Sequence, residues 1–137
     1  MTKISKIQAA EVTNLLPLFH DYLKFYRVEP KTTNESFLKD RIQNNDSVVF
    51  VAKDGEKIVG FAQLYFTYSS LMQGKVVILN DLYILPEFRR KNLAGMLIDK
   101  TLEYAKEKNL QVIVYCPFVA TYLKRHPEYN FLVKNPG

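Results

Sequence analysis

Two periodicities of apolar residues divide the chain into expected helices and strands. Helical spacing begins at Val12 and ends at Tyr26, with apolar positions at Val12, Leu15, Leu16, Phe19, Tyr22, Leu23 and Tyr26. Pro17 requires that this helix either begin near Asn14, which puts the proline in the first turn, or begin earlier and bend. Further helices are expected over about 35–43, 92–108 and 119–125.

Strands are expected where β-branched and aromatic residues alternate, or run continuously, between turn residues. Residues 76–85 form an apolar run broken only by Asn80 and Asp81, which is typical of a strand buried on both faces. Pro86 ends this strand because proline cannot donate to a ladder. Asp54-Gly55 indicates a hairpin turn between two neighbouring strands. The remaining strands are expected over 2–8, 48–53, 58–68 and 111–115.

The resulting order is strand, two helices, three strands, helix, strand and helix. The helix over 92–108 connects strand 76–85 to strand 111–115, so these two strands should run parallel, joined by a crossover. The strands joined by hairpins should run antiparallel. We therefore expect an α/β (or α+β) protein with a mixed sheet. A length of 137 residues predicts one domain over 1–137.

A basic turn separates the long apolar strand from the helix that follows it. Arg89, Arg90 and Lys91 are consecutive cations, and the helix should begin at about Asn92. A helix N-terminus has free N–H groups and partial positive charge, so together with these side chains it should attract phosphate. The turn contains neither the eight-residue P-loop pattern nor G-x-G-x-x-G, which argues against a Walker or Rossmann nucleotide site.

The same stretch carries a family resemblance. The segment "LYILPEFRRKNLAGMLI" resembles the acetyl-CoA signature of the GNAT N-acetyltransferase superfamily, Arg/Gln-x-x-Gly-x-Gly/Ala. Arg89 matches its first position and Ala94 its last, whereas Asn92 stands where the family usually has glycine. Asparagine tolerates positive φ better than most residues. The resemblance extends from about Val12 to Tyr122, and the segments "SVVFVAKDGEKIVGFAQLYFTYSS" and "VILNDLYILPEFR" are similar to the small-amine branch of the family.

The resemblance implies a GNAT fold: a mixed, mostly antiparallel sheet with a splayed parallel strand pair and flanking helices. It also implies that acetyl-CoA lies in the gap between the splayed strands, where its arm hydrogen-bonds to backbone as an added strand would. The chain stops soon after the last helix, so a final strand is expected to be short, missing or supplied by a second chain in a homodimer. The implied cofactor contacts are Leu82, Tyr83, Ile84, Arg89, Arg90, Lys91, Asn92, Leu93, Ala94 and Gly95.

Roles in catalysis also follow from the resemblance. Tyr122 is expected to protonate the departing thiolate, and the alternative is that it packs the helix on the sheet or only holds the sulfur. Asp81 is expected to act as a base or to attract a cationic amine, and the alternative is a carboxylate bonded to backbone. Cys116 is either an acyl-accepting nucleophile or a small buried hydrophobe. The expected acceptor-binding residues are Tyr22, Tyr26 and Asn80.

The amino-acid composition limits which binding partners and which cellular compartment we expect. The net charge of +5 favours anionic partners, such as nucleic acid or the phosphates of coenzyme A. Neither a bilayer-spanning apolar run nor the apolar core of a signal peptide is evident. The single Cys116 excludes an intramolecular disulfide and suits a reducing cytoplasm, and one cysteine with two histidines gives no zinc pattern. We therefore expect a cytoplasmic protein without a membrane partner or a metal.

Three functions compete at this stage. The first is an acetyl-CoA-dependent N-acetyltransferase that moves acetyl directly to a primary amine of a small molecule or protein. The second is a GNAT-shaped module that binds coenzyme A or a partner with little or no turnover, a hypothesis motivated by Asn92 and the short C-terminus. The third is a small basic nucleic-acid binder. It is the least favoured because the basic residues cluster only at one turn and in the tail.

Overall fold

The computed structural model describes residues 2–134, which form one six-stranded sheet in the order β1-β2-β3-β4-β5-β6. The strands are β1 (Thr2–Lys6), β2 (Ser47–Asp54), β3 (Lys57–Ser69), β4 (Gly74–Ile84), β5 (Gln111–Val114) and β6 (Val133–Lys134). Strands β1 to β4 pair antiparallel, whereas β5 pairs parallel with β4 and β6 parallel with β5. The expected mixed, mostly antiparallel sheet is confirmed.

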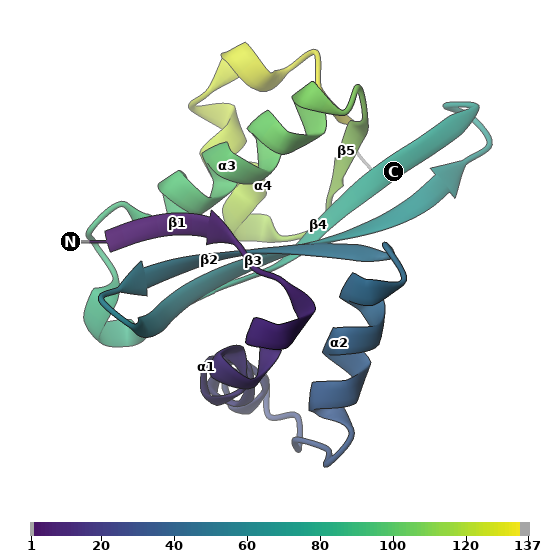
Figure 1. Ribbon diagram of the computed structural model, residues 1–137. Coiled ribbons are helices and arrows are strands. Elements are labelled where there is room, and N and C mark those ends of the chain that lie inside the picture. The colour runs from purple at the N-terminus through teal and green to yellow at the C-terminus, as the bar shows by residue number, and fades with distance from the viewer. Residues whose placement is uncertain (1, 135–137) are drawn as a thin grey trace.

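Helices cover both faces of this sheet (Figure 1). They are α1 (Val12–Phe25), α2 (Asn34–Gln43), α3 (Leu93–Glu107) and α4 (Pro117–Lys124), with 3-10 turns η1 (Ala9–Glu11), η2 (Pro86–Phe88) and η3 (Pro127–Tyr129). In Figure 1, α1 and α2 lie on one face, and α3 lies on the other. The α4 helix begins two residues before its expected start because Pro117 suits the first turn, where the N–H that proline lacks would have no partner.

The first helix resolves the question raised by Pro17. It begins at Val12, so the earlier of the two expected starts is correct. Pro17 lies on the exposed side, where the carbonyl that loses its backbone donor can bind water. Tyr26, which was expected on the apolar face, instead caps the helix C-terminus with its side chain 59% exposed. Its apolar spacing therefore did not predict burial.

Alternation along the central strands sends side chains to both helical layers. Phe50 of β2 packs against Tyr104 of α3 with ring centroids 5.8 Å apart. Phe61 of β3 packs edge-on against Tyr22 of α1 at 5.2 Å. Helix α3 buries Leu102 completely, so truncating this side chain to alanine should destabilise the fold by about 2–5 kcal/mol.

The C-terminal segment completes the sheet with a very short strand. Val133 and Lys134 of β6 pair with Val112 and Ile113 of β5, so of the three expected alternatives the short strand is correct. Residues 135–137 of the expected tail lie outside the described part of the chain. Within residues 2–134, no helix is both long and apolar enough to cross a membrane.

Candidate functional site

The parallel strands β4 and β5 part in the middle of the sheet. They pair only over Val76–Leu79 and Gln111–Val114, while β4 continues to Ile84. Asn80 lies at an irregularity in the pairing of β4 with β3, where the register shifts by one residue. A cavity of about 650 Å³ adjoins the unpaired part of β4. It is lined by Phe25, Tyr26, Leu82, Tyr83, Ile84, Phe88, Arg89, Arg90, Asn92, Leu93, Ala94, Gly95, Cys116, Phe118 and Tyr122. We call this cavity the cleft.

One wall of the cleft is the free edge of β4. Leu82, Tyr83 and Ile84 line it, and within the described residues this stretch pairs only with β3. A strand edge of this kind offers backbone N–H and C=O groups to an extended ligand. The expected splay of the parallel pair is therefore confirmed, and its edge faces the cleft.

The opposite end of the cleft is the N-terminus of α3. The first N–H of the helix to bond backwards is that of Met96, which donates to the Asn92 carbonyl at 3.1 Å. The N–H groups of Leu93, Ala94 and Gly95 precede it, and such groups have no partner inside a helix. All three residues line the cleft, so their donors and the helix dipole favour an anion there.

Asn92 adopts the conformation that the family usually assigns to glycine. Its φ and ψ are 61° and 22°, in the left-handed region that asparagine tolerates better than most residues. Its side chain folds back over Gly95, where an added Cβ would lie 2.5 Å from Asn92 Oδ1 and 3.1 Å from the Tyr122 ring. A side chain at residue 95 would therefore disturb both neighbours, and glycine lets the Asn92 side chain and the Tyr122 ring pack against the start of α3.

The three consecutive cations point in different directions. The Arg89 Nε donates to the Ile84 carbonyl at 2.9 Å, and its guanidinium lies 5.4 Å from the centre of the Tyr83 ring. Arg90 lines the cleft with a φ of 66°. Lys91 does not line it; its ammonium lies 5.1 Å from the Phe88 ring. Phe88 itself lines the cleft, so Lys91 lies beside the cleft, and its expected contact with the cofactor stays a prediction.

Tyr122 of α4 lines the cleft, but its proton is directed elsewhere. Its hydroxyl donates to Asp99 Oδ1 at 2.8 Å, and the Tyr129 hydroxyl donates to the same oxygen at 2.9 Å. Burial and the hydrogen bond to the Asp99 carboxylate raise the pKa of Tyr122 to about 12. The ring stacks on His126 at a centroid distance of 3.9 Å. The sequence did not signal this network because its members lie on three separate elements.

Asp81 and Tyr22 form a second pair beside the cleft. The Tyr22 hydroxyl donates to Asp81 Oδ1 at 2.6 Å. Burial raises the pKa of Asp81, and the hydrogen bond from Tyr22 partly offsets that effect. Burial raises the pKa of Tyr22, and the hydrogen bond to the Asp81 carboxylate and its charge raise it further. Asp81 therefore bonds a side chain and not the backbone, and it favours the protonated form more than an exposed aspartate does.

The expected acceptor residues divide between two places. Tyr26 lines the cleft, whereas Asn80, Asp81 and Tyr22 are not among its lining residues. Cys116 is buried and lines the cleft directly after β5. Phe25 and Phe118, both largely exposed, also line it.

Side chains that could hold a metal do not gather here. Among residues 2–134, there is no group of three or more His, Cys, Asp or Glu side chains arranged to ligate an ion. The groups available for chemistry are the backbone donors, tyrosines and Cys116 of the cleft, with the Tyr22–Asp81 pair beside it.

Three comparisons relate this chain to known proteins. A family model for the GCN5-related N-acetyl-transferase matches residues 49–132. The uncharacterised N-acetyltransferase YhfO of Bacillus subtilis is 33% identical over 111 residues, covering 80% of this chain and 74% of that protein. A thialysine N-ε-acetyltransferase of Caenorhabditis elegans is 34% identical over 98 residues, covering 70% of this chain and 60% of that protein.

A solved structure shares the fold. An acetyltransferase of Clostridium acetobutylicum, crystallised with acetyl-CoA, superposes with a TM-score of 0.75 at 18% identity, covering 92% of this chain and 88% of that one. The family match spans more than half of the chain and includes both parted strands and the N-terminus of α3. The resemblance seen in the sequence is thereby confirmed: the chain belongs to the GCN5-related N-acetyltransferase (GNAT) superfamily and is an N-acetyltransferase.

Proposed function

We propose that the cleft binds acetyl-CoA and that the enzyme transfers the acetyl group directly to a primary amine of a small molecule or protein. The observation that carries this proposal is the convergence of two backbone features on one cavity of about 650 Å³: the free edge of β4 and the unpaired amides of α3. The edge would hold the pantetheine arm, and the amides of residues 93–95 would hold the pyrophosphate.

The residues of the cleft fit such a ligand. Gly95 lines the cleft at the helix N-terminus, and Arg90 adds a full positive charge where a diphosphate would lie. Aromatic side chains from α1 and α4 line the same cavity and suit an apolar chain. Acetyl-CoA is also the molecule crystallised with the similar fold from Clostridium acetobutylicum.

Transfer requires two proton movements. The amine nitrogen bonds to the thioester carbonyl carbon, the carbon–sulfur bond breaks, and the sulfur keeps the electron pair. In our proposal Tyr122 then protonates this thiolate, which requires its hydroxyl to exchange Asp99 for sulfur as acceptor. Asp81 accepts the proton of the amine through water, because it does not line the cleft itself. Exchange with solvent restores both groups.

The acceptor is a primary amine in this proposal. A thialysine N-ε-acetyltransferase is among the relatives and has a lysine-like amine in the name of its substrate. Tyr26 and the aromatic rings of Phe25 and Phe118 surround the cleft and suit an amine attached to an apolar stem. We also propose a cytoplasmic protein without nucleic acid as a partner. The homodimer was expected as one way to supply the last strand, and β6 of the same chain occupies that place.

A weak or inactive binding module is the second candidate, because the proton of Tyr122 is already directed to Asp99. A thiol-release assay with acetyl-CoA against a broad panel of primary amines separates the two functions. Amine-dependent release of coenzyme A supports the enzyme. Saturable acetyl-CoA binding without release for any amine supports the module, and the absence of binding at millimolar acetyl-CoA contradicts both.

A further inference from the structure

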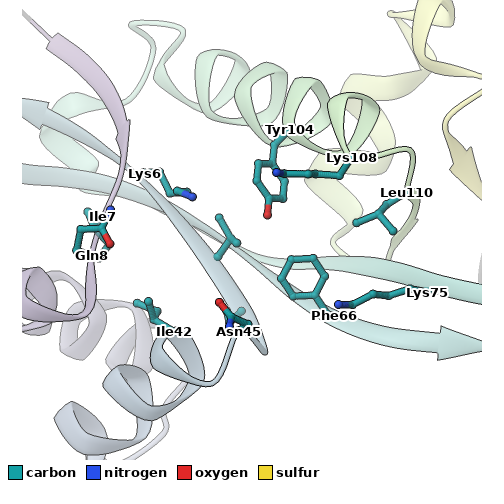
Figure 2. A pocket seen from close by; sticks show the side chains of 12 residues that line it. Lys6, Ile7, Gln8, Ile42, Asn45, Phe66, Lys75, Tyr104, Lys108 and Leu110 are labelled. Carbon is teal, nitrogen blue, oxygen red and sulfur yellow. The ribbon is translucent and has the colours of Figure 1, made fainter.

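A second cavity lies at the other end of α3, away from the cleft. Its volume is about 430 Å³, and it shares no lining residue with the cleft. Figure 2 shows it between the last turns of α3, the end of β1 and the hairpin of β3 and β4. The side chains used below are Lys6, Lys75 and Lys108 with the rings of Phe66 and Tyr104. We call this cavity the basic hollow.

Three ammonium groups point into the basic hollow from three different elements (Figure 2). The Nζ atoms of Lys6 and Lys108 each lie 5.8 Å from the centre of the Tyr104 ring. The Nζ of Lys75 lies 4.7 Å from the centre of the Phe66 ring. The three side chains are exposed to solvent, and their ends lie around the rim of one space.

Among the residues that the structure describes, carboxylates do not balance these charges. The residues that line the basic hollow include neither aspartate nor glutamate. Within residues 2–134, none of the three lysines forms an ion pair. Gathering like charges raises the electrostatic free energy, and an anion between them would lower it. Lys108 alone has another explanation, because a cation at a helix C-terminus favours the dipole, but that reason does not apply to Lys6 or Lys75.

The other walls define what kind of anion fits. A cavity of this volume falls in the range of small-molecule sites and has room for an organic body beside its charged groups. The rings of Phe66 and Tyr104 give that body apolar surfaces to contact. The Tyr104 hydroxyl, like that of any ordinary tyrosine, is protonated at neutral pH and can donate to an anionic oxygen. The C-terminus of α3 presents carbonyls, which do not attract an anion, so attraction comes from the lysines and the Tyr104 hydroxyl. A ligand with several negative charges gains most from three ammonium groups.

We propose that the basic hollow is a binding site for a small organic polyanion that carries two or more phosphate or carboxylate groups. This site is separate from the cleft, and both can be filled at once because they lie at opposite ends of α3. The inference does not depend on the function proposed for the cleft.

Amide chemical shifts of the ¹⁵N-labelled protein test the proposal. The probes are fructose 1,6-bisphosphate for phosphate and citrate for carboxylate, titrated at constant ionic strength. We expect saturable shifts for the amides of residues 6–8, 75 and 104–110, while those of residues 93–95 stay in place. The probe that binds more tightly identifies the anionic group that the site prefers. Shifts confined to residues 93–95, or no saturable shift with either probe, would overturn the proposal.

Charge-matched variants make the result specific. Removing a charge-assisted contact should weaken binding about tenfold for each lysine, so Lys6→Gln, Lys75→Gln and Lys108→Gln combined should abolish the titration. The control combines Lys3→Gln, Lys31→Gln and Lys124→Gln, which lowers the net charge equally at exposed positions outside the basic hollow. Equal binding by both triple variants contradicts the site. Shifts seen only with single-stranded RNA, and with neither small probe, contradict a small-molecule ligand.

Discussion

The two ends of α3 present two different ways of attracting an anion. At its N-terminus, the cleft offers the amides of residues 93–95, which follow the left-handed backbone of Asn92. At its C-terminus, the basic hollow offers only the side-chain charges of Lys6, Lys75 and Lys108. The first site uses donors that no side-chain substitution removes, and the second uses donors that substitution removes directly.

This difference predicts opposite sensitivities. Binding in the cleft should respond to shape and backbone conformation, because its donors belong to the helix itself. Binding in the basic hollow should respond to charge number and ionic strength, because exposed ammonium groups are screened by salt. The following substitutions in and beside the cleft are ordered by the size of their expected effect, and each should leave the basic hollow unchanged.

The largest effect is expected for Ala94→Glu. A carboxylate at the start of α3 suits the helix dipole, so the fold should persist, but it would repel the diphosphate by about 4 kcal/mol at 4 Å and an effective dielectric constant of 20. The rise in melting temperature with acetyl-CoA should disappear. Ala94→Gln adds similar bulk without charge and should retain most of the shift; equal loss in both variants would indicate a steric effect and not an electrostatic one.

Tyr122→Phe should lower kcat by about 10²-fold, the lower end of the effect of a general acid, with little change in KM for acetyl-CoA. The ring can still stack on His126, so stability should change little. Steady-state kinetics measure the split, and an unchanged kcat would exclude the hydroxyl as the donor.

Asp99→Asn tests the same proton by changing its hydrogen-bond acceptor, the Asp99 carboxylate, and leaving the Tyr122 donor in place. The Asp99 carboxylate helps to raise the pKa of Tyr122 to about 12, so a neutral amide should lower that pKa. If Tyr122 must be protonated for turnover, the decline of kcat at alkaline pH should then begin at a lower pH than in the wild type. Identical pH profiles for the two proteins would argue against a catalytic proton on Tyr122.

Asn92→Val should destabilise the native state by roughly 1–2 kcal/mol, because a β-branched residue is disfavoured at a φ of 61°. Acetyl-CoA affinity should fall with it, since the amides that follow are positioned by this residue. Asn92→Gly should keep both stability and affinity close to the wild type. Urea unfolding and calorimetric titration measure the two quantities, and a valine variant that behaves like the glycine variant would remove the backbone explanation.

The smallest effect is expected for Asp81→Asn. Burial places the folded-state pKa of Asp81 above its ordinary value, so between the two pKa values the native state holds a proton that the unfolded state releases. The free energy of unfolding therefore falls as the pH rises from the unfolded-state pKa through the folded-state pKa. Asparagine carries no such penalty and can still accept from Tyr22. The variant should therefore unfold at higher urea than the wild type at neutral pH, and this advantage should vanish as the pH falls below about 4. Its turnover should fall, because an amide accepts no proton.

Local sequence patterns predicted much of the fold and part of the site. The strand, turn and helix from 76 to 108 are contiguous, so Leu82, Tyr83 and Ile84 and the residues at the start of α3 were expected together, and they line one cleft. Their contact with acetyl-CoA stays a prediction. The left-handed backbone of Arg90 and Asn92, on either side of Lys91, belongs to the folded turn, and residue spacing does not encode it.

The sequence patterns did not predict the hydrogen-bonded side-chain pairs between distant elements, for a different reason. Tyr22 bonds Asp81, and Tyr122 and Tyr129 share Asp99, only because folding brings distant elements together. Each of these side chains could also be explained by an ordinary structural role within its own helix or strand, so the sequence did not favour the pairing. The three lysines of the basic hollow are likewise spread over the chain, and no short motif joins them.

Titration of the ¹⁵N-labelled protein with acetyl-CoA tests the central claim most directly. The account predicts saturable amide shifts for residues 82–84 along the free edge of β4 and for residues 93–95 at the start of α3, with residues 6, 75 and 108 unaffected. Saturable shifts that leave residues 82–84 and 93–95 in place, or no shift at millimolar acetyl-CoA, would contradict it.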